Sequence, residues 1–282
     1  MPQAIERILT YISQRYGFDF PARQNTLYRE KILDRAGSLG LNRLDDYLSY
    51  LKISTEEEDR LLDFLTINVS RFFRTPLTFE YLAHNTLPAL LSEKNKGEIR
   101  IWSAGCAMGE EPYSIAILTR ELMKKRNIAP RVRIFATDIN PKILKQAEQG
   151  IYLEEQIMNV RHGLVADYFK SRENRYHLSK GIKKMVSFSF YDMMDTRTYV
   201  PPESVFGNFD LVLCRNLLIY FSLKNQQKIF DKLFRALRAG GCLVLGTTET
   251  VPEAYSPQLV REIPHCPVFR KPGPHSSPQG DF

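Results

Sequence analysis

The chain has 282 residues and a formal net charge of +7, with 43% hydrophobic and 25% charged residues. This balance is typical of a globular protein of one large or two modest domains and excludes a largely disordered chain. No apolar run approaches the roughly 20 residues that cross a bilayer, and the N-terminus lacks the pattern of a secretory signal. We therefore expect a cytoplasmic protein that does not insert into a membrane.

Helical periodicity dominates the first part of the chain. Apolar residues recur at three- and four-residue steps in four stretches, 5–17, 26–40, 43–54 and 56–70. Thr55, followed by three glutamates, predicts the N-cap and acidic first turn of the fourth helix. We predict a small all-helical domain over residues 1–75 and a linker helix over residues 76–96.

From about residue 97, short β-rich apolar runs alternate with helical stretches. The runs are 99–104, 131–138, 185–190, 209–214 and 242–247, and the helical stretches are 111–126, 141–149 and 224–240. Nearly continuous apolar strands between helices are typical of a parallel sheet covered on both faces. The sequence predicts an α/β domain with a doubly wound sheet over residues 97–282.

One segment does not fit a single crossover helix, and we interpret residues 152–184 as an insertion. It contains a helical piece over 160–169 and a hairpin pattern over 175–188. After it the sheet pattern resumes, until the Pro-, Gly- and Ser-rich tail over 271–282, which we expect to be mobile.

In doubly wound sheets, ligands bind beyond the carboxyl ends of the strands. The loop after the first strand holds Gly105 and Gly109, which allow close backbone approach, and Glu110, which opens a helix. The loop lacks the G-x-G-x-x-G pattern, and a carboxylate at a helix start repels phosphate but accepts an ammonium group. The alternative is a plain glycine turn with a solvated acid.

Asp138 ends the second strand, where a carboxylate can bind both hydroxyls of a ribose. Alternatively, it caps the helix that begins at Pro141. Beside a loop that disfavours pyrophosphate, an adenosyl ligand without phosphates is favoured, and S-adenosylmethionine (SAM) fits. After the third strand, Asp192 can accept from the adenine amine while Met193 packs on the ring, or Asp192 is a turn residue.

The fourth strand leads directly into Cys214, Arg215 and Asn216, and Tyr220 follows. Polar residues at this end of a buried strand indicate function, although a helix entry and a half-buried aromatic explain them too. The motif over 67–76 joins two aromatics to arginines. It suits single-stranded nucleic acid, but an amphipathic helix end is the commoner explanation.

The four cysteines lie far apart and form no C-x-x-C pair or zinc spacing, so we expect reduced thiols and no metal site. The basic excess is also uneven. Residues 1–76 hold eleven basic and eleven acidic residues, whereas residues 161–184 carry seven Lys or Arg against two acids. This stretch is either a solvated face or a docking surface for an acidic partner.

Four segments together resemble the chemotaxis receptor methyltransferases of the CheR type. They are 68–74, 102–114, 136–139 and 214–221. The resemblance covers nearly the full chain and implies a class I SAM-methyltransferase domain with a small inserted β-subdomain, preceded by a small all-helical domain. It also implies methyl transfer from SAM to glutamates on the cytoplasmic helical bundle of chemoreceptors, giving γ-methyl esters and S-adenosylhomocysteine.

The resemblance further implies a role for each matching residue. Asn68, Ser70 and Arg74 would close over the cofactor, with Arg74 and Tyr220 as catalytic residues beside the methyl group. The remaining cofactor contacts would be Ala104 and Glu110 at the methionine end, Asp138 at the ribose, Asp192 and Met193 at the adenine, and Cys214, Arg215 and Asn216 along the pocket.

Three positions depart from the family pattern. Ser70 stands where Thr is usual and Asp192 where Asn is frequent, but both keep a hydrogen-bond acceptor. The stretch 170–175 lacks the glycine of members that grip a receptor's tether peptide, which counts against tether binding. Two alternatives stay open: a non-catalytic SAM-sensing module, and a nucleic-acid methyltransferase, although the fourth strand lacks a Pro-Pro-aromatic signature.

Overall fold

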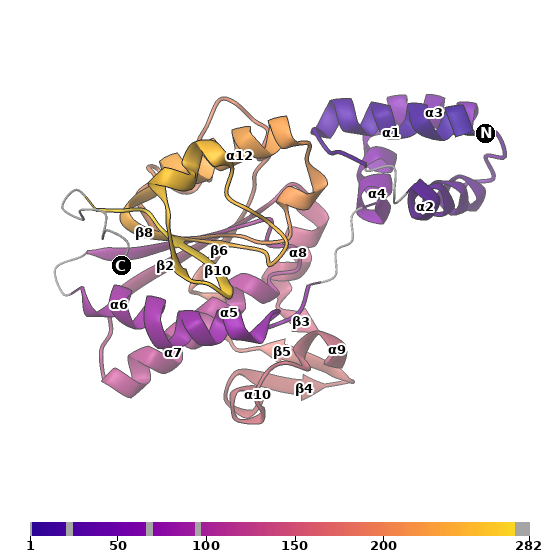
Figure 1. The fold of residues 1–282 in the computed structure, drawn as a ribbon. Coiled ribbons are helices and arrows are strands. Elements are labelled where there is room, and N and C mark those ends of the chain that lie inside the picture. Colours follow the sequence, from indigo (N-terminus) through magenta and orange to yellow (C-terminus); the bar gives the residue numbers. More distant parts are fainter. Residues whose placement is uncertain (1, 21–24, 66–69, 94–96, 274–282) are drawn as a thin grey trace. The chain divides into compact units, whose positions relative to one another are not determined.

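The computed structural model describes residues 2–20, 25–65, 70–93 and 97–273 (Figure 1). The chain divides into two compact units. One comprises residues 1–69 with 218–228, and the other comprises residues 70–217 with 229–282.

The first unit is helical, as the periodicity predicts. Its elements are α1 (Pro2–Tyr16), α2 (Asn25–Ser38), α3 (Leu44–Ile53), α4 (Thr55–Leu65) and the 3₁₀ helix η3 (Leu218–Tyr220). Apolar side chains from the first four helices are fully buried, among them Ile8, Ile32, Leu51 and Leu61. Burial of one apolar stripe per helix holds the unit together.

The cap of α4 lies one residue earlier than the sequence predicts. The helix begins at Thr55, but the hydroxyl of Ser54 accepts from the amide of Glu57 at 3.2 Å. The prediction of Thr55 as the N-cap is therefore wrong. Two adjacent hydroxyl residues offer the same cap chemistry, and the helix start selects between them.

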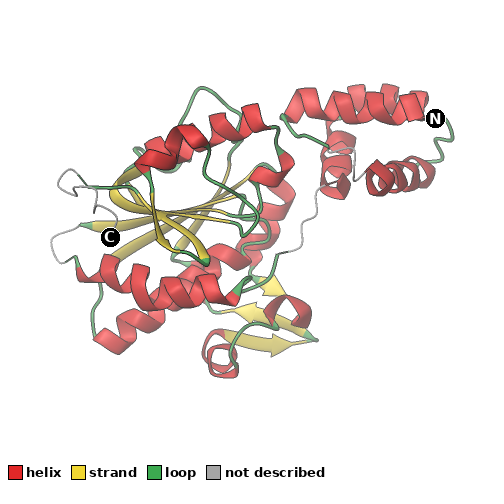
Figure 2. Ribbon diagram, viewed as in Figure 1, coloured by secondary structure: helices red, strands yellow, loops and turns green. Residues whose placement is uncertain are grey.

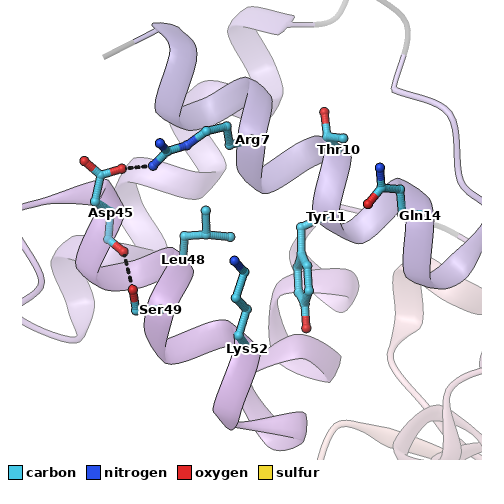
Figure 3. A pocket seen from close by; sticks show the side chains of 8 residues that line it. All are labelled: Arg7, Thr10, Tyr11, Gln14, Asp45, Leu48, Ser49 and Lys52. Atoms are coloured by element: carbon cyan, nitrogen blue, oxygen red, sulfur yellow. Dashed lines mark hydrogen bonds and ion pairs between the residues drawn. The ribbon is translucent and has the colours of Figure 1, made fainter.

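A polar hollow of about 470 Å³ opens between α1 and α3 of this unit (Figure 3). An ion pair between Arg7 and Asp45 joins the two helices across it. Both side chains are more than half exposed, in contrast to the buried pair of Arg35 with Glu57, to which the Tyr47 hydroxyl also donates.

The second unit contains a large sheet, whose strands are yellow in Figure 2. Its seven strands lie in the order β6-β2-β1-β7-β8-β10-β9. The strands are β1 (Glu98–Ala104), β2 (Arg131–Asp138), β6 (Val186–Phe190), β7 (Phe209–Cys214), β8 (Leu237–Leu245), β9 (Val260–Ile263) and β10 (Cys266–Arg270). The first five are mutually parallel, and β10 pairs antiparallel with β8 and β9. The α/β class is confirmed, with an antiparallel edge that the sequence did not reveal.

Helices cover both faces of this sheet (Figure 1). They are α5 (Pro76–Tyr81), the π-helix η2 (Leu82–Thr86), α6 (Leu87–Ser92), α7 (Glu110–Arg126), α8 (Pro141–Gln149) and α12 (Leu223–Ala236), and the 3₁₀ helix η4 (Glu253–Gln258) follows β8. The predicted helix over 224–240 is four residues too long, because β8 already begins at Leu237. The alanines and arginines in that stretch favour a helix, but the pairing of Leu237 with Phe209 of β7 makes it a strand.

The insertion forms a small sheet in the order β3-β5-β4 with three short helices. Its elements are β3 (Ile151–Tyr152), α9 (Glu154–Ile157), α10 (His162–Tyr168), β4 (Phe169–Arg172), β5 (Arg175–Leu178) and α11 (Lys180–Lys183). The predicted hairpin over 175–188 is wrong, since β4 and β5 pair around Glu173 and Asn174. Both turn residues have positive φ, a two-residue hairpin geometry reached here without glycine.

Candidate functional site

The chain order reverses between β1 and β7 in the large sheet. From β1 the chain proceeds through β2 to β6 on one side, and from β7 to β8 on the other. The loops after two neighbouring parallel strands diverge at such a point and leave a crevice beyond their carboxyl ends. The register pairs Ala104 with Cys214 at this edge.

The loop after β1 has a backbone that requires its glycines. Gly105 and Gly109 have φ of +73° and +88°. A Cβ on Gly109 would lie 3.1 Å from side chains of α7, α8 and β6, and one on Gly105 would lie 3.1 Å from Leu217. The loop therefore folds tightly over the strand end, as the glycines predict.

Asp138 holds this loop in place from the end of β2. One carboxylate oxygen accepts from the amide of Ala107 at 2.9 Å, and the other accepts from the amide of Asn140 at 3.1 Å. The N-cap of α8 is Asn140, whose side chain accepts from Lys142 and Ile143, so the capping interpretation of Asp138 is wrong. Burial raises the pKa of Asp138, and the amide hydrogen bonds oppose that rise.

Glu110 is the first residue of α7 and is fully buried. Its Oε1 accepts from Nε2 of Gln156 at 2.7 Å, whereas its Oε2 is buried without a hydrogen-bond partner among the described residues. Burial raises the pKa of the Glu110 carboxyl, and the Gln156 and Ser70 side chains oppose the rise. A buried carboxylate oxygen without a donor is costly unless a ligand supplies one.

Arg215 ties the loop after β7 to two other segments. Its Nη1 donates to Glu111 at 3.1 Å and its Nη2 donates to the carbonyl of Arg74 at 2.8 Å, while the Ser103 hydroxyl donates to the other Glu111 oxygen at 2.7 Å. The guanidinium also lies 5.2 Å from the ring centre of Phe79. Arg74 itself is exposed, with its backbone anchored at this edge of the sheet.

The segment around Arg74 is strained and is held by further hydrogen bonds. Phe73 and Thr75 have positive φ, which is costly for residues other than glycine. The amide of Phe73 donates to the Ser114 hydroxyl at 3.0 Å. We call residues 70–76 the strap.

Ala104 and Cys214 are fully buried at the adjoining strand ends. Burial raises the pKa of the Cys214 thiol well above its ordinary value, which favours the protonated, less reactive form. Asn216 follows with a positive φ, and its backbone amide donates to the Glu249 carboxylate at 2.9 Å.

Asp192 and Met193 follow β6, next to β2 at the same edge of the sheet. Asp192 accepts from the amide of Met194 at 2.7 Å, and Met193 is buried. Burial raises the pKa of Asp192, and the nearby amine of Lys232 opposes the rise.

The structure thus gathers most of the sequence-predicted site residues at one sheet edge: Ala104, Glu110, Asp138, Asp192, Met193, Cys214, Arg215 and Asn216, with the backbone of Arg74. Asn68 lies outside the described residues. Tyr220 belongs to the helical unit, where its carbonyl accepts from the amide of Asp19 and its ring meets Phe18 edge-on.

Sequence reasoning missed three residues at this edge: Glu111, Gln156 and Glu249. Glu111 directly follows Glu110 in the sequence, so this acidic pair could have indicated both residues. Gln156 reaches Glu110 across 46 positions and Glu249 reaches Asn216 across 33, and no local pattern marks these long-range contacts.

In the part of the chain that the structure describes, no group of three or more His, Cys, Asp or Glu residues is arranged to hold a metal ion. All four cysteines are buried and free. Among the described helices, none is long and apolar enough to cross a membrane.

Two family descriptions match the chain. Residues 68–264 match the SAM-binding domain of the CheR methyltransferases, and residues 3–66 match their all-alpha domain.

Curated relatives match over most of both chains. The chemotaxis protein methyltransferase of Borreliella burgdorferi is 31% identical over 88% of this chain and 88% of its own length. That of Escherichia coli is 30% identical over 86% and 82%, and chemotaxis protein methyltransferase 2 of Vibrio cholerae is 30% identical over 94% and 89%.

The residues at the sheet edge fit a SAM cofactor. The unpartnered Oε2 of Glu110 suits an ammonium donor, and the glycine loop lets a ligand approach the backbone closely. Together with the sequence matches, this makes the chain a SAM-binding member of the CheR methyltransferase family.

Proposed function

We propose that the chain transfers the methyl group of SAM to glutamate side chains in the cytoplasmic domains of chemoreceptors. The products are glutamate γ-methyl esters and S-adenosylhomocysteine, and the enzyme acts in the cytoplasm. The names of the relatives, which are chemotaxis protein methyltransferases, support this proposal.

Each residue at the sheet edge then has a role toward the cofactor. Glu110 binds the methionine ammonium beside Ala104, Asp138 binds the ribose, and Asp192 with Met193 binds the adenine. Cys214, Arg215 and Asn216 line the pocket, and Asn68, Ser70 and Arg74 close over it.

The chemistry requires little from the protein. When bound, SAM supplies an electrophilic methyl carbon on its sulfonium. A glutamate carboxylate is already ionised at neutral pH because its ordinary pKa is about 4.3, so no general base is needed. The site must align the carboxylate oxygen with the methyl carbon and exclude water.

The observation that carries the proposal is the hydrogen bond from Arg215 to the backbone carbonyl of Arg74. This hydrogen bond fixes the backbone of Arg74, an exposed cationic residue on the strained strap, at the sheet edge where the cofactor would bind. An arginine there pairs with an incoming carboxylate through its forked donors. We assign Arg74 the task of orienting the substrate glutamate.

The direct test incubates the full chain and methyl-tritiated SAM with receptor cytoplasmic fragments. Label on the receptor that is released by mild base supports glutamate methylation. No label, with SAM still bound, points to a SAM-sensing module, and label on added RNA or DNA contradicts the proposal.

Arg74→Ala tests the catalytic assignment. We expect transfer to fall at least 100-fold, while the affinity for SAM measured by calorimetry falls far less, because Arg74 acts mainly on the substrate. Near-normal turnover would remove Arg74 from the mechanism. Arg71→Ala, an exposed arginine three residues earlier, is the matched control.

Tyr220 keeps its proposed catalytic role, and Tyr220→Phe tests the hydroxyl in the same assay. The domain boundaries after residues 75 and 96 are also a proposal, to be checked by limited proteolysis.

A further inference from the structure

Gln156 is a residue of the insertion whose side-chain and backbone polar groups are all hydrogen-bonded. Its Oε1 accepts from the amide of Leu153 at 2.9 Å, and its Nε2 donates to Glu110 at 2.7 Å. Its backbone carbonyl accepts from the amide of Phe72, in the strap, at 3.0 Å. Because the Leu153 amide can only donate, the side-chain amide has one orientation, with its NH₂ group toward the carboxylate.

Glu110 depends on that donor. The carboxylate is fully buried, Gln156 donates to its Oε1 at 2.7 Å, and the Ser70 side chain is a second group that favours its charged form. Removing the donor leaves a buried charged oxygen unsatisfied, which costs far more than the loss of an exposed hydrogen bond.

The insertion touches the same site at two further points. The hydroxyl of Tyr152 donates at 2.8 Å to the carbonyl of Met108, in the loop after β1. The ring of Phe72 packs edge-on against Tyr152 and Phe169, with centroids 4.8 and 5.3 Å apart. The loop after β1 and the strap therefore both contact residues of the small β3-β5-β4 sheet.

We infer that Gln156 is a positioning residue through which the insertion completes the SAM site, by orienting the Glu110 carboxylate toward the methionine end of the cofactor. The inference rests on the proposed role of Glu110. The affinity for SAM thus depends on a residue that the large sheet does not supply.

A purely structural role is the competing explanation, in which Gln156 only fastens the insertion to the sheet. The two differ in how Gln156 and Glu110 combine. A positioning residue has no effect once the carboxylate is gone, whereas a fastening residue has the same effect with or without it.

The experiment measures SAM affinity by calorimetry on the full chain for Gln156→Leu, Glu110→Gln and the double variant. We expect Gln156→Leu to weaken binding about 10-fold or more at pH 7.5, the effect of losing a hydrogen bond to a charged group. In the Glu110→Gln background the same change should alter binding less than twofold. Gln149→Leu, an exposed glutamine on α8, is the matched control.

Measuring SAM affinity over a range of pH adds a second test, because a purely structural role of Gln156 would not change its pH dependence. Wild-type affinity should decline as the pH falls and Glu110 becomes protonated. In Gln156→Leu the decline should begin at higher pH, because the carboxylate has lost a donor that stabilises its charged form. The titratable groups near Glu110 are Cys106 and Tyr152, whose pKa values are raised well above neutral by burial, and Glu111, which pairs with Arg215.

The outcomes separate the inference from the proposed function. If Glu110→Gln weakens binding but Gln156→Leu stays within twofold of wild type, the inference is wrong and the role of Glu110 stands. Equal losses in both backgrounds also contradict it. If Glu110→Gln itself binds SAM normally, the proposed role of Glu110 fails and the inference fails with it.

Discussion

Glu110 combines complete burial with a carboxyl group, and the role that we propose for it toward the cofactor comes at the expense of stability. Among the described residues, Gln156 donates to its Oε1 and the Ser70 side chain also favours its charged form, while its Oε2 has no hydrogen bond within normal distance. Because its pKa is raised in the folded chain, the folded state binds the proton more readily than the unfolded state does. The buried charge therefore lowers stability in the absence of cofactor.

This linkage gives a prediction for the chain without SAM. Stability from a group with a raised folded pKa is present below its unfolded value and is lost as the pH rises through the folded value. Glu110→Gln removes the charge, so the variant should unfold at higher urea concentration than wild type at pH 8. The two should converge toward pH 4.5, and a constant difference across this range would contradict the assignment.

Gly109 offers a second prediction at the scale of one residue. Its φ of +88° is unfavourable for alanine, and the added Cβ would lie only 3.1 Å from three neighbouring side chains. Gly109→Ala should lower the free energy of unfolding by about 1–3 kcal/mol.

Gly163→Ala is the matched control for Gly109→Ala. Gly163 lies within α10 and has nothing within 4 Å of a Cβ, so alanine there should be neutral or stabilising by up to about 1 kcal/mol. Urea unfolding of both variants checks the pair. Equal stabilities would show that the loop after β1 relaxes freely.

At the scale of elements, two of the arginine–carboxylate pairs in the described part of the helical unit differ in burial. Arg35 and Glu57 join α2 to α4 with side chains 16% and 2% exposed, whereas Arg7 and Asp45 join α1 to α3 with both more than half exposed (Figure 3). Exposed pairs gain little because water screens them, but a buried carboxylate left alone is strongly destabilising.

We therefore expect Arg35→Ala to cost roughly 3 kcal/mol or more and Arg7→Ala less than about 1 kcal/mol. Amide hydrogen exchange in α2–α4 of the full chain measures both, since it reports opening of this unit directly. Similar protection in the two variants would contradict the distinction.

Prediction of elements from sequence succeeded where the pattern is local. Four helices and five parallel strands follow from apolar periods of 3.6 and from continuous apolar runs. Two of the errors arose where neighbouring candidates of similar chemistry compete. Ser54 rather than Thr55 caps α4, and β4 with β5 rather than 175–188 forms the hairpin. The cap depends on where α4 begins, and the hairpin depends on the pairing of β5 with β3 and β4.

At the scale of the whole molecule, the basic stretch 161–184 lies on the insertion. Within it, Lys180 and Lys184 are exposed, whereas Lys183 donates to the carbonyl of Gln149 at the end of α8 and packs over Gly150. We propose that the exposed charges steer the enzyme toward acidic receptor helices, with Lys183 serving structure instead.

Neutralising Lys180 and Lys184 with glutamine should then slow receptor methylation several-fold at low salt, leave SAM affinity unchanged and lose its effect at high salt. Lys142→Gln with Lys145→Gln on α8 changes the net charge equally at exposed positions and is the control. An equal effect of both pairs in initial-rate measurements would assign the steering to net charge alone.

The sequence alone determined the helical and α/β units and the loops that hold the site, because hydrophobic period and strand-end chemistry are written in neighbouring residues. Only the tertiary structure decided which distant residues meet at the candidate site. Gln156 reaches Glu110 across 46 positions and Arg215 reaches the carbonyl of Arg74 across 141. Such contacts depend on strand order and on the packing of the insertion, which no local pattern encodes.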